Sequence, residues 1–268
     1  MNTLTNTSNK NRKHHLFQNP VMNKFSKITE KSDQHVTYNG VAKKCGFFVL
    51  MIIAGIVLTF LTNFFSGISH TFSDKYPLPV IILASIATLC FIITPFITIF
   101  AKKGIPVFGS IFCVSVGVIY SSAALFIDEY RNYILLAMIL TIALFSALTL
   151  LFTFNIIKVN QKFRSTAYTI LATLVITGLI LAISFFVPVL NGAVTAIITN
   201  PLWCIGISLI GVALASMFIL IDLQNVREAV ENQVPKSYEW DGAFGIVFSV
   251  IWLFAEILQL LTSTKDAF

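Results

Sequence analysis

Seven long apolar stretches dominate this chain of 268 residues. The hydrocarbon core of a bilayer is about 30 Å thick, and a helix needs roughly 20 apolar residues to cross it. Each stretch must be helical, because a lone strand in lipid would leave its backbone N–H and C=O groups without partners. The sequence therefore predicts an all-α, polytopic membrane protein with seven transmembrane helices over Phe47–Ile68, Leu78–Phe100, Ile105–Ile127, Tyr133–Ile157, Thr166–Pro188, Trp203–Leu223 and Gly242–Leu261.

Composition separates the chain into two parts. Overall it is 56% hydrophobic and 11% charged, which is unlike a soluble globular protein. Residues 1–46 are instead rich in Asn, Thr, Ser and Lys, and they carry too little apolar surface to offset the entropy lost on ordering. We therefore expect residues 1–46 to form a disordered, basic tail and residues 47–268 to form one seven-helix transmembrane domain.

The distribution of basic residues predicts the orientation in the membrane. Loops that stay in the cytoplasm carry an excess of Lys and Arg. A cytoplasmic N-terminus places 15 of the 18 basic residues inside. The other side then holds only Lys75, Arg131 and Lys265. We expect the N-terminus in the cytoplasm and the C-terminus outside. The net charge of +6 is thereby explained by topology, and it does not indicate nucleic-acid binding.

Two acidic residues stand in or beside the last two apolar stretches: Asp222 and Glu256. A charge at the centre of a membrane helix costs about 2.5–3.5 kcal/mol on insertion scales, so such residues usually have a function. On a helical wheel, small residues share the face of each acid. Small faces let membrane helices approach closely. We expect these faces to meet in an antiparallel hairpin centred near residue 239, which would place both acids at similar depth. The small residues are Ser208, Gly211 and Ala215 beside the first acid, and Gly242, Gly245 and Ser249 beside the second.

Proximity of two carboxylates suggests their chemistry. They cannot both ionise cheaply in a site of low dielectric, so they would titrate as a unit and share one proton or bind a cation. Ca²⁺ prefers oxygen ligands and would suit the pair. Asn225 and Gln259 each follow an acid by three residues and offer auxiliary amide oxygens. The alternative is that Asp222 simply faces the cytoplasm at the interface and that Glu256 binds a structural partner.

The end of the chain resembles the Bax inhibitor-1 family, the transmembrane Bax inhibitor motif proteins. The resemblance is carried by Ile221–Gln224, Tyr238–Trp240, Ala243–Gly245 and Trp252–Leu258. Asn19-Pro20-Val21 is similar to a bacterial branch with a long N-terminal tail. The family implies seven helices with the last one central, and a pair of aspartates that senses pH for a Ca²⁺ leak. The bacterial resemblance implies the plasma membrane.

Two positions bear on how far this resemblance extends. Asp222 matches the first aspartate of the family's pair, whereas Glu256 stands where the second is usual and adds a methylene group. A basic group after the second helix can latch one aspartate in such proteins, and Lys102 and Lys103 occupy roughly that place. Lysine lacks the planar fork of arginine, so a latch made by either would be weaker.

Other classes of function are less compatible with the residues. None of the seven stretches contains a histidine, which removes a Ser–His protease or an HExxH zinc site, and a GxGD motif is absent. The four cysteines are scattered, so we expect no metal cluster and no disulfide framework. We also expect no cofactor and no enzymatic activity. The sequence favours a pH-sensitive Ca²⁺ leak channel. A proton-coupled transporter and a membrane scaffold or regulatory protein without transport stay open as alternatives.

Overall fold

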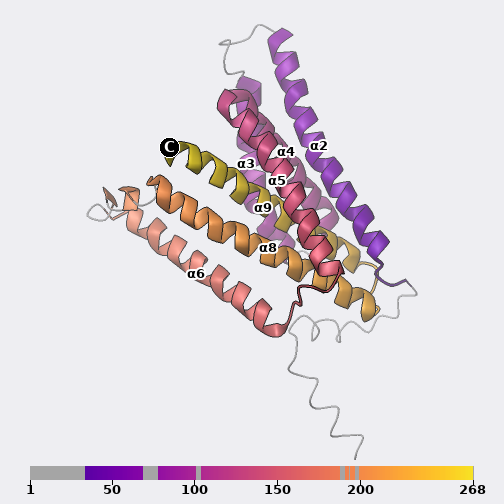
Figure 1. Ribbon diagram of the computed structural model, residues 1–268. Helices are drawn as coiled ribbons and strands as arrows, with labels where there is room; N and C mark the ends of the chain where they lie inside the picture. Colours follow the sequence, from indigo (N-terminus) through magenta and orange to yellow (C-terminus); the bar gives the residue numbers. More distant parts are fainter. Residues whose placement is uncertain are drawn as a thin grey trace, which may run out of the picture.

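Long helices make up almost all of the described chain. The computed structural model describes residues 34–267 apart from 69–77, 101–103, 188–190, 193, 197 and 198. Within these residues seven helices are long and apolar enough to cross a membrane. In the labelling of Figure 1 they are α2 (Tyr38–Ile68), α3 (Leu78–Phe100), α4 (Ile105–Phe126), α5 (Asp128–Thr153), α6 (Gln161–Phe185), α8 (Pro201–Glu231) and α9 (Tyr238–Ala267). The predicted fold class is confirmed, and the protein is an integral membrane protein.

The first helix begins earlier than expected. Helix α2 starts at Tyr38, and Val36 and Val41 are buried, so residues 34–46 belong to the folded domain. The sequence boundary at residue 46 was set by the first long apolar run, and this criterion misses polar turns that extend a helix beyond the bilayer. The remainder of the predicted disordered tail, residues 1–33, lies outside the described part.

The last helix lies at the centre of the bundle, as predicted (Figure 1). Helix α9 packs against α2, α4, α5 and α8. Helix α3 packs on α2 and α4, and α6 packs on α8 at the edge of the bundle. This arrangement gives α9 and α8 a long shared interface in which the two candidate acids lie.

A close contact between α2 and α4 stabilises one side of the bundle. Gly55 and Gly117 face each other, and a Cβ atom added at either would meet backbone atoms of the opposite helix. One turn further along α2, the Thr59 hydroxyl accepts a hydrogen bond of 2.8 Å from the buried Ser121 hydroxyl. Small residues permit this approach, and the hydroxyl pair fixes the register of the two helices.

The outer surface of the helices is apolar. Phe60 on α2, Ile92 on α3 and Ile139 on α5 are each more than half exposed, and many other large apolar side chains share this exposure. Such a surface is unfavourable in water and favourable against lipid chains. It fits the bilayer environment predicted from hydropathy.

Candidate functional site

The α8–α9 interface is built from the small faces predicted from the sequence. On α8, Ser208, Gly211 and Ala215 are buried. On α9, Gly245 and Ser249 face back toward α8. The absence of bulky side chains here lets the two helices approach and leaves room for polar groups between them. Both predicted acids lie in this interface, and each is partly buried.

Asp222 lies toward the end of the interface that is nearer to the α8–α9 turn. Its Oδ2 accepts a hydrogen bond of 2.6 Å from the Ser249 hydroxyl. Its carboxylate packs against Gly245, where an added Cβ would stand 3.3 Å from Oδ1. The positive charge of Arg164, on α6, also acts on Asp222. The carboxylate is therefore held by a hydroxyl from α9 and is influenced by the positive charge of a residue on α6.

Glu256 lies further along α9, in a different setting. Its Oε1 accepts a hydrogen bond of 2.9 Å from the indole Nε1 of Trp252, one turn earlier on the same helix. The carboxylate fills the notch left by Gly211 on α8. The negative charge of Glu256 acts on the Tyr120 hydroxyl of α4. On α8, one turn from Gly211, the fully buried Ser208 hydroxyl has no hydrogen-bond partner.

The two acids share the interface but lie at different levels, which corrects the prediction of similar depth. Asp222 packs against Gly245 and Ser249, whereas Glu256 packs against Gly211. At about 1.5 Å per residue, these contacts place the two carboxylates roughly 10–15 Å apart along the helices. The position of the turn between α8 and α9 explains this difference in depth. Helix α8 ends at Glu231 and α9 begins at Tyr238, so the hairpin is centred near residue 234 and not near residue 239.

The predicted auxiliary residues do not gather around the acids. The Asn225 Oδ1 accepts a hydrogen bond of 2.8 Å from Arg164, so its amide oxygen is engaged with α6. Gln259 is exposed on α9. Lys102 and Lys103 lie outside the described residues. Helix α8 continues beyond Leu223, where the sixth apolar stretch ends, and reaches Glu231.

Sequence reasoning missed Arg164, a cation whose charge acts on Asp222. Arg164 stands in the first turn of α6, and its guanidinium spans Asn225 and Glu228, with an ion pair of 2.7 Å to Glu228. Gln224 donates to the same Glu228 oxygen over 3.1 Å. The i, i+4 spacing of Gln224 and Glu228 was a visible signal of a polar face on α8. Nothing in the sequence indicated that α6 would supply its partner.

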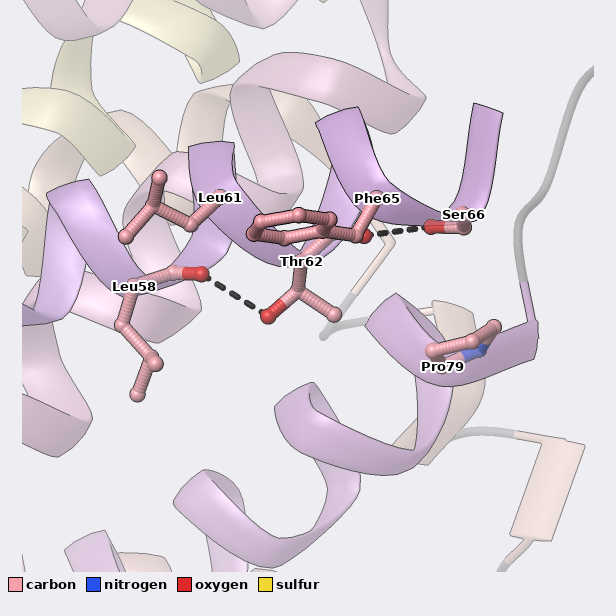
Figure 2. Close-up of a pocket in the computed structure, with 6 residues that line it drawn as sticks. All are labelled: Leu58, Leu61, Thr62, Phe65, Ser66 and Pro79. Atoms are coloured by element: carbon pink, nitrogen blue, oxygen red, sulfur yellow. Dashed lines mark hydrogen bonds between the residues drawn. The ribbon is translucent and has the colours of Figure 1, made fainter. Parts of the chain in front are cut away.

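No preformed metal cluster occurs among the residues that the structure describes: no three His, Cys, Asp or Glu side chains gather there. A groove of about 500 Å³ lies between α2 and α3, away from both acids. Figure 2 shows that Leu58, Leu61, Phe65 and Pro79 line it, and that the hydroxyl of Thr62 is bonded to backbone within α2. Ser66 completes the lining, which is mostly apolar, carries two hydroxyl groups and offers no charged group.

A comparison with known families bears out the resemblance found in the sequence. The model of the family described as Bax inhibitor 1 like matches residues 19–266. The chain belongs to the Bax inhibitor-1 family. No curated protein matches the chain, and no solved structure matches it. In this member of the Bax inhibitor-1 family, Asp222 and Glu256 are separated along the α8–α9 interface.

Proposed function

We propose that this protein is a pH-sensitive cation leak channel without enzymatic activity, and that Ca²⁺ is the ion it passes. The observation that carries the proposal is the placement of Asp222 and Glu256 on one small-residue interface of the central helix. Intramembrane carboxylates usually mark ion or proton pathways. Membership in the Bax inhibitor-1 family supports the same function.

The separation of the acids changes how the pair would work. Carboxylates roughly 10–15 Å apart do not share one proton, so each gains or loses its own. We propose two successive oxygen stations along α8 and α9, Asp222 with Ser249 at one and Glu256 with Tyr120 at the other. When ionised, each carboxylate attracts a cation, and when protonated it does not. The leak would then depend on pH through two titrating groups.

The orientation in the membrane belongs to the same proposal. The excess of Lys and Arg on one side supports a cytoplasmic N-terminus and a C-terminus on the outside. Asp222 would then stand near the cytoplasmic end of the interface and Glu256 in the outer half. The bacterial plasma membrane remains the expected location.

Calcium flux through reconstituted liposomes tests the proposal. Liposomes that contain a Ca²⁺ dye are compared between the parent, Asp222→Asn, Glu256→Gln and the double variant, with Glu231→Gln as a control at an exposed carboxylate. We expect each single variant to reduce the pH dependence and the double variant to abolish it, whereas the control keeps it. A double variant that responds like the parent contradicts the role of these acids.

The same liposomes separate the alternatives. A proton-coupled transporter would move protons in proportion to a second substrate, whereas a leak moves Ca²⁺ down its gradient without such coupling. A parent protein that passes no Ca²⁺ at any pH contradicts the channel and favours a scaffold or regulatory protein.

A further inference from the structure

A short segment before α2 is paired with the turn between α8 and α9. We call residues Gln34–Thr37 the N-terminal strap. The Val36 N–H donates to the Val234 carbonyl over 2.9 Å, and the Lys236 N–H donates to the Gln34 carbonyl over 3.0 Å. These two bonds form an isolated antiparallel bridge. The strap therefore joins the start of the folded domain to a hairpin almost 200 positions later in the sequence.

The strap also engages a strained residue of that turn. Gln233 has a φ of 52°, in the left-handed region that non-glycine residues rarely adopt. Its carbonyl lies 2.9 Å from the ring Nδ1 of His35. Strained backbone persists where surrounding contacts hold it. The strap thus supplies one of the contacts at the tightest point of the α8–α9 turn.

A buried carboxylate anchors the strap to α9. Glu239 is 1% exposed and accepts hydrogen bonds of 3.1 Å from both the N–H and the hydroxyl of Thr37. The ammonium of Lys44 pairs with the other carboxylate oxygen and lies over the Trp240 ring. Gly40 leaves the space that the carboxylate occupies. A buried charge that loses its partners is strongly destabilising, so these contacts hold the strap in place as a unit.

An apolar layer separates the strap from Asp222. Val226 lies one turn beyond Asp222 on α8, and Gly242 lies one turn before Gly245 on α9. A Cβ atom added at Gly242 would stand 3.0 Å from Val226, and the next neighbour is Val41 of α2. Val41 and Val226 are buried together with Val36 of the strap and Val234 of the turn. The interface between α8 and α9 is therefore closed by valine side chains on the side of Asp222 that faces the turn.

We propose that the N-terminal strap is a gate, which closes the approach to Asp222 from the α8–α9 turn while Glu239 holds Thr37 and Lys44. Lifting the strap from the turn would break the Thr37 contacts with Glu239 and expose Val36, the one buried residue among the four of the strap. Lifting removes Val36 and loosens Val41 and Val226 beneath it. The gating role rests on the proposed leak function, whereas the opening of the valine layer is measurable without any ion flux.

Thiol labelling at position 226 tests the gate. The full-length chain is placed in lipid nanodiscs with Cys45, Cys90 and Cys204 changed to Ala, Cys113 retained, and Val226→Cys as the reporter. A charged, membrane-impermeant methanethiosulfonate is the probe. We expect Glu239→Gln to accelerate labelling of the reporter about tenfold, and Thr37→Val to accelerate it less, because each weakens the contact between Glu239 and the strap. Glu231→Gln, an exposed carboxylate at the end of α8, should leave the rate unchanged.

Cys113 reports on the fold in the same samples, because it is fully buried in the core. Faster labelling of the reporter with Cys113 unlabelled supports the gate. If Glu239→Gln and Thr37→Val both label the reporter at the rate of the parent, the proposed gate is overturned. Labelling of Cys113 in parallel with the reporter also overturns it, because it would indicate that the whole fold has loosened. Calcium flux measured on Glu239→Gln is a separate arm. If Glu239→Gln accelerates labelling of position 226 but does not change the Ca²⁺ flux, the leak function is rejected and the opening of the strap is supported.

Discussion

Asp222 and Glu256 lie on the same α8–α9 interface but are bound by different partners at different levels. Asp222 accepts from Ser249, and Glu256 accepts from Trp252 and fills the notch at Gly211. At roughly 12 Å and an effective dielectric constant of about 20, two unit charges interact by about 1.4 kcal/mol, or about one pH unit. At about 4 Å the same estimate gives about 4 kcal/mol, or roughly three pH units.

Trp252 provides a test of this separation, because its indole donates directly to Glu256. In a chain with Trp203→Phe and Trp240→Phe, protonation of Glu256 removes the charged acceptor and changes the fluorescence of Trp252. We expect a pH-dependent emission that Glu256→Gln abolishes. Asp222→Asn should move its midpoint by no more than about one pH unit. A movement of about three pH units would instead indicate carboxylates in contact.

The fit between Gly211 and Glu256 predicts a strong coupling between these positions. A methyl group at position 211 would occupy the place of the Glu256 carboxylate. We expect Gly211→Ala to displace that carboxylate from Trp252 and to lower stability by about 1–3 kcal/mol, as overpacking does. In a Glu256→Ala background the same change should cost little, because the clashing group is gone.

A double-mutant cycle on SDS unfolding, followed by circular dichroism, measures this coupling. Additive effects of Gly211→Ala and Glu256→Ala would contradict the contact. Gly206→Ala is the matched control on the same helix, because an added Cβ there has no neighbour within 4 Å.

Hydropathy and helical periodicity predicted the seven helices and the small faces that meet between α8 and α9. The depth of the acids was beyond this reasoning. Placing Asp222 opposite Glu256 required a hairpin centred near residue 239, a few positions beyond Pro235, and hydropathy does not determine where a turn between two helices forms. The turn forms at Asn232–Pro235 because Gln233 adopts a left-handed conformation there and Val234 pairs with the strap. Both causes depend on the folded chain.

Partners from distant helices were equally hidden. Glu239 and Lys44 are 195 positions apart, and Arg164 and Glu228 are 64 apart. Each residue taken alone resembles a solvated charge at a helix end. Which ion pairs form depends on which helices pack side by side. Hydropathy predicts where the helices are in the sequence but not how they pack. Residues 38–46 were assigned to the tail for a related reason: Val41 is buried in one cluster with Val226 and Val234, and Lys44 pairs with Glu239, all distant in sequence.

Arg164 provides a polar link between α6 and α8, and its replacement should loosen α6. The guanidinium fork reaches Asn225 and Glu228 together. Arg164→Lys keeps the charge and loses the fork, so we expect a loss of about 1–2 kcal/mol and faster hydrogen exchange at the start of α6. Arg131→Lys, at an exposed position on α5, is the control. Unchanged exchange in Arg164→Lys would show that apolar contacts with α8 suffice.

The contact between Gly55 and Gly117 predicts which glycines in the membrane can accept a side chain. A Cβ atom added at Gly55 would meet the Val114 carbonyl and stand 3.1 Å from the Gly117 Cα. These are backbone atoms of α4, so relief requires the two helices to separate and strains the bond between Thr59 and Ser121. We therefore expect Gly55→Ala to cost at least about 2 kcal/mol.

Gly178 on α6 is the matched control for this change, because an added Cβ there has no neighbour within 4 Å. Alanine favours helix over glycine by about 0.8–1 kcal/mol, so Gly178→Ala should be neutral or stabilising. SDS unfolding of both variants measures the difference. Equal effects at the two positions would mean that helix propensity alone decides the outcome. A selective loss at Gly55 would establish the close approach of α2 and α4, because there, unlike at Gly178, the added methyl group meets backbone atoms of a neighbouring helix.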